Sequence, residues 1–363
     1  MISEKTMKAA VYHGVRDIRI DELPIPEIGP DDVLLRSRMA AVCGSDIHPY
    51  RTGKCVHTGQ IFGHEYVAEV AEVGANIKHY KIGDRVYGAN YAPCGKCWYC
   101  RRGDPAHCVH SRDSFTGQGL PGAFAQYFRF IMPERPDPPT KHINTLMHIP
   151  DSVSDEQAAL IEPFGVGLAA VETCSVKPGD VVVVLGAGPI GLSIIQWIKS
   201  LNATAVSVDV SQRRLECAKL CGADYVISNE KGDCYEQVVA IFGETGWLNG
   251  PETAAVDTVI DSAGYPLSFN DALKTVKCGG TVCQLAVTET MSEVNTTYIT
   301  YKDIRILSST ECDAAGALDG IISGRVHPEL LVDGHISLEE ITEAFEKQSH
   351  AQAIKLLVKM KES

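Results

Sequence analysis

An apolar run followed by a glycine-rich turn and a helical segment constrains the fold of this 363-residue chain more than any other feature. Residues 181–185 are all apolar, as expected for a strand buried on both faces of a sheet. A helical pattern runs from Pro189 to Leu201, and a second apolar strand follows near residues 205–208. Strand and helix patterns continue to alternate up to about residue 310. The sequence therefore predicts an α/β domain with a doubly wound parallel sheet.

The turn after the first strand indicates a dinucleotide-binding site. Its glycines follow the spacing G-x-G-x-x-G, at Gly186, Gly188 and Gly191. Such glycines let the backbone approach a pyrophosphate closely, and the N-terminus of the following helix points unpaired N–H groups at it. A glycine turn that only packs a helix on a sheet is the alternative, and the complete βαβ setting argues against it.

The second strand ends at Asp209, which bears on the choice of cofactor. A carboxylate about 20 residues after the glycine turn can accept hydrogen bonds from ribose hydroxyls and would repel a 2′-phosphate. We therefore predict NAD, while Arg213 and Arg214 leave NADP open as an alternative. The predicted cofactor-binding residues are Gly186, Gly188, Pro189, Ile190, Gly191, Asp209 and Arg214.

Four cysteines stand close together with the spacing C-x2-C-x2-C-x7-C, at Cys94, Cys97, Cys100 and Cys108. Disulfides and a C-x-x-C redox pair are alternatives. The odd total of 13 cysteines and the absence of an export signal argue against a disulfide framework. Four thiolates fill the tetrahedral coordination of zinc and leave no position for water or substrate. The run therefore predicts a structural zinc site.

Charge and hydropathy exclude two classes of partner. The formal net charge is −13, whereas nucleic-acid binding needs clustered lysine and arginine. The N-terminal residues show no basic segment followed by an apolar core, and no apolar run is long enough to cross a bilayer. We expect a cytoplasmic protein that binds neither nucleic acid nor a membrane.

A second group of metal-binding residue types lies earlier in the chain. The segments AVCGSDIH and FGHEYV supply Cys43, Ser45, Asp46, His48, His64 and Glu65. Cysteine, histidine and carboxylate are the ligand types of catalytic zinc, which keeps one position open for water or a substrate oxygen. A buried core thiol and a hydrogen-bonded core histidine are the alternatives, and spacing alone does not decide between them.

Several motifs occur in the order found in one enzyme family. They are CGSDIH, GHEYVAEVAEVG, GDRVYG, the four-cysteine run, GAFAQY, IPDSVSDEQAALIEP and VLGAGPIGL. From about Lys8 to its C-terminus the chain resembles the zinc-containing medium-chain alcohol dehydrogenases, and Glu162 followed by Pro163 is similar to their polyol and sorbitol dehydrogenase branch. The resemblance implies a partly β, GroES-like catalytic domain and an NAD-binding Rossmann domain. The implied ranges are 1–153 and 311–363 for the catalytic domain, 91–110 for its structural zinc lobe, and 154–310 for the Rossmann domain.

The resemblance also implies roles for single residues. Cys43 and His64 would bind a catalytic zinc ion, so that each chain would hold two zinc ions. Glu65 and Glu162 would compete for a further position on the catalytic ion. Asp46 would orient His64, which is the usual support of a zinc-bound histidine.

Ser45 and His48 would be the catalytic residues, relaying a proton from the substrate hydroxyl to solvent. We predict NAD-dependent oxidation of a secondary hydroxyl of a polyol, cyclitol or sugar derivative. A simple alcohol or threonine-type dehydrogenase is the alternative, and a non-catalytic, zinc-braced binding protein is a more remote one. Because relatives are dimers and tetramers, we expect a homodimer or homotetramer. The proline-rich segment 132–142 is expected to form an extended loop.

Overall fold

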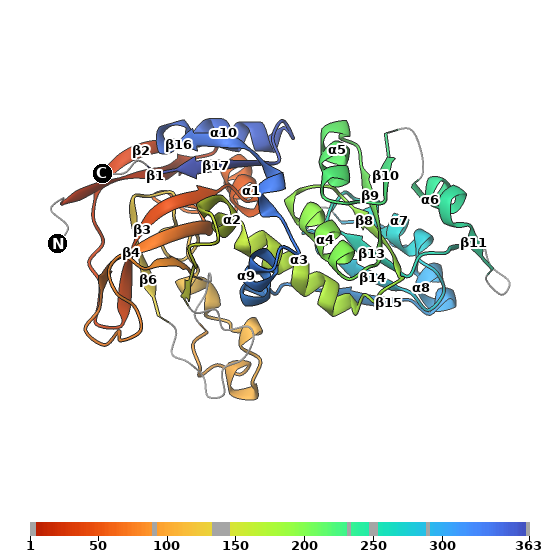
Figure 1. The fold of residues 1–363 in the computed structure, drawn as a ribbon, viewed down its shortest axis with the longest axis horizontal. Helices are drawn as coiled ribbons and strands as arrows, with labels where there is room; N and C mark the ends of the chain where they lie inside the picture. The colour runs from red at the N-terminus through yellow and green to blue at the C-terminus, as the bar shows by residue number, and fades with distance from the viewer. Residues whose placement is uncertain are drawn as a thin grey trace. The chain divides into compact units, whose positions relative to one another are not determined.

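The computed structural model describes residues 5–88, 93–132, 146–230, 234–246, 253–287 and 291–360. Its contacts divide the chain into two compact units, coloured by residue number in Figure 1. Unit 1 comprises Met1–Glu162 and Val332–Ser363, and unit 2 comprises Pro163–Leu331. The proline-rich segment falls almost entirely on residues 133–145, outside the described ranges. None of the helices in the described ranges combines the length and apolarity needed to cross a membrane.

Unit 1 is built around a mainly antiparallel sheet. Its strands are β3 (Asp32–Ala41), β4 (Glu65–Val73), β5 (Arg85–Tyr87), β6 (Tyr127–Ile131), β7 (Met147–His148), β16 (Val332–Ser337) and β17 (Lys355–Lys359). Their order is β16-β17-β3-β4-β5-β7, and β6 also pairs with β3. A separate hairpin joins β1 (Thr6–Gly14) to β2 (Asp17–Pro24). Because β17 pairs with β3, the C-terminal segment of the chain lies beside the strand that leads to Cys43 (Figure 1).

Two helices of unit 1 support the candidate site residues. Helix α1 (Gly44–Thr52) follows β3 almost directly, and α10 (Ile341–Ser349) packs beside it. The rings of Tyr50 and Phe345 lie 4.9 Å apart, and both side chains are buried. Burying one such side chain contributes roughly 1.5–3 kcal/mol. The Tyr50 hydroxyl also donates to Glu346 at 2.8 Å, so packing and a hydrogen bond together hold α1 against the C-terminal segment.

Unit 2 contains a six-stranded parallel sheet within the described residues, which confirms the predicted doubly wound fold. Its strands are β8 (Val181–Leu185), β9 (Thr204–Asp209), β10 (Tyr225–Ser228), β13 (Thr258–Asp261), β14 (Thr281–Gln284) and β15 (Arg305–Ser308). The strand order is β10-β9-β8-β13-β14-β15. The chain therefore winds outward in one direction from β8 and in the other from β13. Ligands of such sheets bind at the carboxyl ends of the strands beside this switch point.

Helices connect or flank these strands, the first of them beginning two residues before the unit boundary, and a short hairpin completes the unit. The helices are α3 (Ile161–Cys174), α4 (Pro189–Ser200), α5 (Gln212–Leu220), α6 (Cys234–Phe242), α7 (Ser268–Thr275), α8 (Thr296–Lys302) and α9 (Ala314–Ile322), and the hairpin pairs β11 (Glu244–Thr245) with β12 (Thr253–Ala254). Helix α4 begins at Pro189, as predicted, because proline tolerates the first helical position, where no N–H is needed. It ends at Ser200, one residue before the predicted end.

The unit boundaries differ from the predicted domain boundaries in two places. Residues 154–162 group with unit 1, because Asp155 in α2 (Asp155–Ala159) accepts hydrogen bonds from Arg38 at 2.9 Å and Arg85 at 2.7 Å. Residues 311–331 group with unit 2. In α9, Gly320 packs so closely on the Trp197 ring that a Cβ there would lie 2.2 Å from it. Both differences come from contacts between residues far apart in the sequence. The catalytic and NAD-binding roles of the two units stay predictions.

Candidate active site and nucleotide site

The structure brings Cys43, His64 and Glu65 together in unit 1. One possible ligand atom from each residue lies within 4.8 Å of the other two. Cys43 is the N-cap residue of α1 and Glu65 is the first residue of β4, so the cluster sits where a helix and a strand begin. Gly63 has a φ of 100°, and a Cβ there would lie 2.9 Å from the backbone nitrogen of Phe124. The turn that presents His64 therefore requires glycine.

Asp46 connects the helix cap to the histidine. Its Oδ2 accepts the backbone N–H of Cys43 at 3.1 Å, and its Oδ1 lies 3.4 Å from His64 Nδ1. The second pair is an ion-pair contact without hydrogen-bond alignment. Burial lowers the pKa of His64, but its interactions with Asp46 and Cys43 together outweigh burial and raise this pKa well above its ordinary value. The cluster is therefore a place that attracts a cation.

The two predicted catalytic residues both lie on α1 and are exposed. Ser45 Oγ lies 3.3 Å from His64 Nε2, the ring nitrogen opposite the one that faces Asp46. His48 Nε2 lies 3.4 Å from the Thr52 hydroxyl. The structure thus brings Ser45 to the cluster and places His48 three residues further along the helix, on the same side.

Glu162, the second predicted carboxylate ligand, lies in the first turn of α3. Burial raises the pKa of Glu162 to about 7, while His64 lowers it and Glu65 raises it further. These electrostatic interactions place the Glu162 carboxyl group near the cluster. Among the described residues, however, the group whose ligand atoms lie within 4.8 Å of one another contains Cys43, His64 and Glu65 without Glu162.

Lys355 of β17 contacts this cluster and was not among the residues predicted from the sequence. Lys355 Nζ donates to Glu65 Oε1 at 2.7 Å and also contacts Oε2, and each side chain is 1% exposed. The same ammonium group donates to the carbonyl of Val42 at 2.9 Å. The sequence did contain a signal that could have identified this residue, a lysine inside the apolar run AIKLLVKM. A lysine buried in such a strand needs a partner of opposite charge or a hydrogen-bond acceptor.

The donor set of this cluster fits a zinc ion. A thiolate, an imidazole and a carboxylate are three ligands of the kind that catalytic zinc uses, and three protein ligands leave a position for a substrate oxygen. Two carboxylates of the cluster region, those of Asp46 and Glu65, are also buried beside the buried His64. Buried charge of this kind is expensive unless a cation compensates it.

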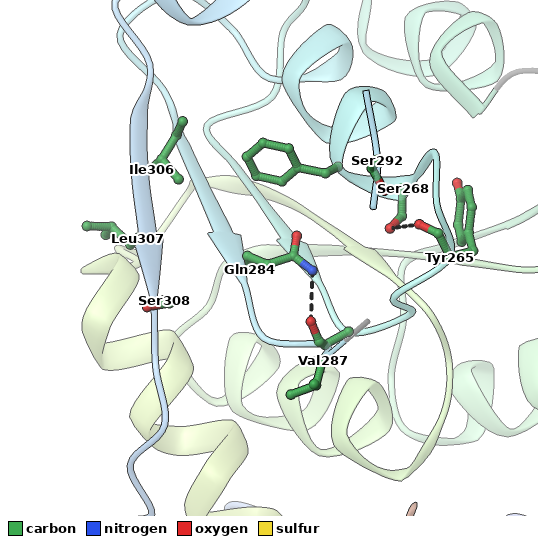
Figure 2. A pocket seen from close by; sticks show the side chains of 10 residues that line it. Tyr265, Ser268, Gln284, Val287, Ser292, Ile306, Leu307 and Ser308 are labelled. Atoms are coloured by element: carbon green, nitrogen blue, oxygen red, sulfur yellow. Dashed lines mark hydrogen bonds between the residues drawn. The ribbon is translucent and has the colours of Figure 1, made fainter. Parts of the chain in front are cut away.

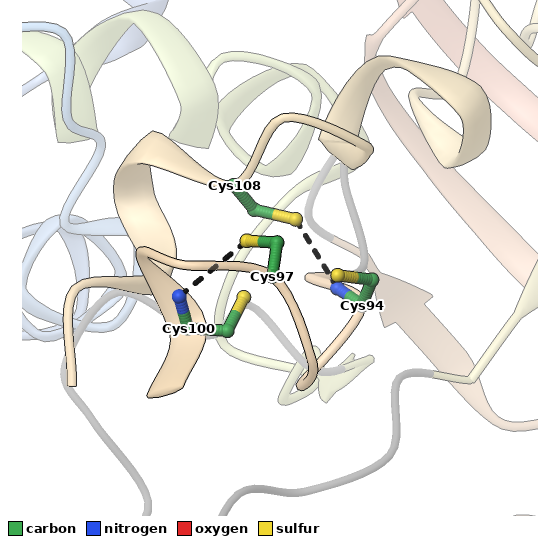
Figure 3. Close-up of side chains that lie close together, drawn as sticks. All are labelled: Cys94, Cys97, Cys100 and Cys108. Atoms are coloured by element: carbon green, nitrogen blue, oxygen red, sulfur yellow. Dashed lines mark hydrogen bonds between the residues drawn. The ribbon is translucent and has the colours of Figure 1, made fainter. Parts of the chain in front are cut away.

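The four cysteines of the predicted lobe converge on one point, as Figure 3 shows. All four thiols are free, and their sulfur atoms lie within 4.8 Å of one another. Cys97 Sγ accepts the backbone N–H of Cys100 at 3.5 Å, and Cys108 Sγ accepts that of Cys94 at 3.3 Å. Backbone N–H groups, that of Cys100 first, lower the pKa of Cys97 to about 6. Four converging sulfurs with N–H support fit a closed, structural zinc site.

The glycine turn of unit 2 joins β8 to α4 and has the geometry that a pyrophosphate needs. Gly186 has a φ of 92°, and a Cβ at Gly191 would lie 1.9 Å from the carbonyl oxygen of Gly186, so both positions require glycine. A Cβ at Gly188 would meet no atom within 4 Å, which leaves room for a ligand. Pro189 and Ile190 form the first turn of α4 and are half-buried. Unpaired N–H groups of such a first turn bind anions.

Asp209 lies at the end of β9 and is bonded to this turn. Its Oδ2 accepts the backbone N–H of Ala187 at 2.7 Å, and its Oδ1 accepts that of Ser211 at 2.8 Å. Arg214 Nη1 lies 3.8 Å from Asp209 Oδ2. The structure therefore brings the predicted residues of the nucleotide site together, and the Arg214 guanidinium faces the Asp209 carboxylate.

Comparison with known proteins identifies the family. The family described as "Alcohol dehydrogenase GroES-like domain" matches residues 29–135, and the family "Zinc-binding dehydrogenase" matches residues 189–320. Sorbitol dehydrogenase of Bacillus subtilis strain 168 is 32% identical over an alignment 371 residues long, gaps included, which covers 98% of this chain and 97% of that protein. L-threonine 3-dehydrogenase of Pseudoalteromonas translucida strain TAC 125 is 32% identical over 298 residues, which cover 80% of each protein.

Two solved structures share the fold over nearly the whole chain. An alcohol dehydrogenase from Escherichia coli CFT073, in complex with NADH, is 26% identical with a TM-score of 0.86, and the match covers 98% of this chain and 100% of that one. A zinc-binding dehydrogenase from Sinorhizobium meliloti 1021, bound to NADP, is 27% identical with a TM-score of 0.85 and the same coverage. The chain belongs to the zinc-containing medium-chain alcohol dehydrogenases, in their polyol and sorbitol dehydrogenase-like branch. The predicted family and the predicted GroES-like and Rossmann folds are confirmed, and the protein is a zinc-dependent oxidoreductase.

Proposed function

We propose that the protein oxidises a secondary hydroxyl of a polyol, cyclitol or sugar derivative to the ketone, with NAD as the hydride acceptor. The observation that carries this proposal is the convergence of Cys43, His64 and Glu65 within 4.8 Å. Bound NAD would supply the hydride-accepting ring, whose reactivity belongs to the cofactor. A metal cluster with an open position and a dinucleotide turn in one chain suit metal-assisted hydride transfer.

Cys43, His64 and Glu65 would hold the catalytic zinc ion, and Glu162 would be a second carboxylate within reach. When bound, zinc supplies a Lewis acid that lowers the pKa of a substrate hydroxyl. Asp46 contacts His64 Nδ1 and so directs Nε2 towards the cluster. The ligand assignment explains why these side chains share one small, buried space.

Ser45 and His48 would carry the released proton away from the site. Ser45 Oγ lies 3.3 Å from His64 Nε2, so a substrate hydroxyl held at the cluster would be within reach of the serine. His48 follows on the same side of α1 and is exposed, which suits exchange of the proton with solvent. The proposed proton path from the buried cluster to the exposed imidazole of His48 therefore runs along helix α1.

The Asp209 carboxylate supports NAD over NADP as the cofactor. It is 8% exposed and held by two backbone N–H groups, so it is fixed in place to accept hydrogen bonds from ribose hydroxyls. Arg214 faces this carboxylate and is less available to a 2′-phosphate. Gly186, Gly188, Pro189, Ile190 and Gly191 would bind the pyrophosphate. Since the solved relatives include one with NADH and one with NADP, the preference rests on Asp209.

Two observations support a polyol or sugar-like substrate. Glu162 is followed by Pro163, as in the polyol branch, and a sorbitol dehydrogenase is among the relatives that match nearly the whole chain. The similarity to L-threonine 3-dehydrogenase favours a second candidate, an amino alcohol as the substrate. The two candidates share the metal cluster and differ in the substrate that it would orient.

We also propose two zinc ions per chain and a homodimer or homotetramer. The four-cysteine lobe would hold the second zinc ion. β15 is the last strand on its side of the sheet of unit 2, and exposed apolar side chains occur on and near it. These are Val287, Met291, Tyr301 and Ile306, which are 94%, 97%, 65% and 42% exposed. A cavity of about 570 Å³ adjoins β15, lined in part by Tyr265, Phe269, Gln284, Ile306 and Leu307 (Figure 2). An apolar edge of this kind is a pairing surface, and a second copy would cover it.

The first experiment follows NADH absorbance with zinc-loaded protein across polyols, cyclitols, sugar phosphates, threonine and simple alcohols, with NAD and NADP in parallel. Strong reduction of NAD with polyols or cyclitols is the expected result. Faster turnover of threonine or simple alcohols would replace the substrate class and leave the zinc chemistry intact. Reduction of neither cofactor by any of these substrates would contradict the proposed function.

A further inference from the structure

Lys355 combines complete burial with contact to the metal cluster. Its side chain and that of Glu65 are each 1% exposed, and both carboxylate oxygens contact its ammonium group. The ammonium group also donates to the carbonyl of Val42, the residue directly before Cys43. Gln348 donates to the same carbonyl at 2.9 Å. Residues of the C-terminal segment of unit 1 therefore hydrogen-bond to the Glu65 carboxylate and to the backbone carbonyl next to Cys43.

A buried lysine can have a purely structural role, and Lys302 of unit 2 is an example. Its side chain is buried, and Nζ donates to the carbonyls of Leu273 and Lys274 at 2.7 and 2.9 Å, near the end of α7. Lys355 differs because its partner is a candidate metal ligand. An ammonium ion and a zinc ion both bind the oxygens of one carboxylate, so the two cations compete for Glu65.

We propose that Lys355 is a positioning residue for the metal site, which competes with the bound ion for the Glu65 carboxylate and so weakens that ligand. The inference rests on the zinc site of the proposed function. A carboxylate has enough lone-pair positions to contact Lys355 and an ion at once. Hydrogen bonds to the ammonium group nevertheless draw charge away from the oxygens.

A weakened carboxylate ligand has a consequence for the open position. Glu65 held by Lys355 can leave the ion without becoming an unpaired buried charge, because the ammonium group keeps it compensated. Glu162 lies near enough to interact with both residues. Lys355 therefore sets how tightly the ion is held and how readily one of its ligand positions opens, and both effects pass through Glu65.

The test measures zinc binding directly. In the full-length protein, a mild chelator removes the ion from the Cys43 cluster while the four-cysteine lobe stays loaded, and zinc is titrated back against a chromophoric chelator. Lys355→Met should bind zinc more tightly than the wild type by about tenfold or more, the scale on which neighbours of metal ligands act. Cobalt(II) in the same site should show a changed visible absorption, because Glu65 becomes a stronger ligand.

Three variants separate this effect from general damage. Lys355→Arg keeps the positive charge and should restore most of the wild-type affinity. Lys302→Met removes an equally buried lysine of unit 2 and should leave zinc binding at the cluster unchanged. In a Glu65→Gln background, Lys355→Met should give little further gain, because the competed carboxylate is absent.

Unchanged or weaker zinc binding by a folded Lys355→Met protein would overturn the proposal, as would an equal gain in the Glu65→Gln background. If the variant does not fold without metal, because Glu65 is left buried and unpaired, zinc release from the loaded protein is measured instead. Slower release than from the wild type supports the proposal, and equal or faster release overturns it. Failure of the proposed function would give a different result from failure of this proposal. In that case the wild-type protein itself would bind no ion at this cluster or would reduce no NAD.

Discussion

The Asp209 carboxylate accepts the backbone N–H of Ala187 at 2.7 Å, so the end of β9 is hydrogen-bonded to the glycine turn after β8. The two parts of the nucleotide site are therefore coupled: the group expected to bind ribose also holds the turn expected to bind pyrophosphate. Ser211 N–H, at 2.8 Å from the other oxygen, completes the support.

Asp209→Ala should raise the Michaelis constant for NAD by about tenfold or more and should admit NADP. The ribose would lose a charge-assisted partner, worth roughly 1.5–3 kcal/mol, and the repulsion of a 2′-phosphate would disappear. Initial rates with both cofactors measure the change. Asp180→Ala is the matched control, because Asp180 also accepts a backbone N–H, that of Lys177 at 2.8 Å, in a loop before β8. An unchanged cofactor preference in Asp209→Ala would contradict the ribose assignment.

Cys43→Ser should lower the zinc content from two ions per chain to one and abolish turnover. A serine hydroxyl is a much poorer zinc ligand than a thiolate. Elemental analysis and NADH formation, measured on the same sample, test both parts. Cys55→Ser changes an exposed cysteine of the neighbouring loop and should alter neither. Full activity of Cys43→Ser would remove Cys43 from the catalytic site.

Cys97→Ser should release the ion of the four-cysteine lobe and destabilise unit 1 by roughly 3 kcal/mol or more, as expected for the loss of a metal site. Binding of NAD to unit 2 should change little, because the lobe supplies none of the predicted nucleotide residues. Thermal unfolding and NADH fluorescence titration separate the two effects. Loss of NAD affinity without loss of stability would argue against a structural role for the lobe.

Ser45→Ala should lower the rate of hydride transfer by about 10² while NAD affinity stays nearly constant. The hydroxyl 3.3 Å from His64 Nε2 would no longer be there to accept the substrate proton. Single-turnover measurements of NADH formation isolate this step from product release. Ser323→Ala, a change on the exposed end of α9, serves as the control. Equal single-turnover rates in Ser45→Ala and the wild type would exclude Ser45 from the relay.

The stability of unit 2 should rise with pH above about 8 because of Lys302. Burial lowers the pKa of Lys302 from 10.5 to about 8, so between these values the unfolded chain binds more protons than the folded one. Stability therefore increases as the pH rises through this window, by an amount on the order of 3 kcal/mol for this group. Denaturant unfolding of the wild type and Lys302→Met from pH 7 to 10.5 measures the difference. Parallel pH profiles of the two proteins would contradict this prediction.

Local patterns predicted the elements of unit 2 well. The apolar run 181–185 became β8, and the spacing of Gly186 and Gly191 matches two positions where a side chain would not fit. Both signals depend on residues close together in the chain, so burial pattern and backbone geometry are visible in the sequence. The ends of the units were not predictable in this way. Helix α9 belongs to unit 2 because Gly320 packs on Trp197, and no local pattern records that contact.

The residues of the candidate metal site were likewise predictable only in part. Residue types and the order of motifs pointed to Cys43, His64, Glu65 and Glu162. Which glutamate joins the cysteine and the histidine depends on the positions of β4 and α3, and the structure brings Glu65 into that group. Lys355 was not found from the sequence, because a lysine in an apolar strand shows that a partner exists without showing which one.

By itself, the sequence determined the family, the parallel sheet, the glycine turn and the two sets of metal-binding residues. These depend on short-range periodicity and on chemistry that a residue type carries with it. Only the tertiary structure decided that Lys355 meets Glu65, 290 residues away, and that Asp209 meets Ala187 across two neighbouring strands. Contacts of this kind arise from strand order and packing, which bring distant residues together in a buried space where unpaired charges and N–H groups must find partners.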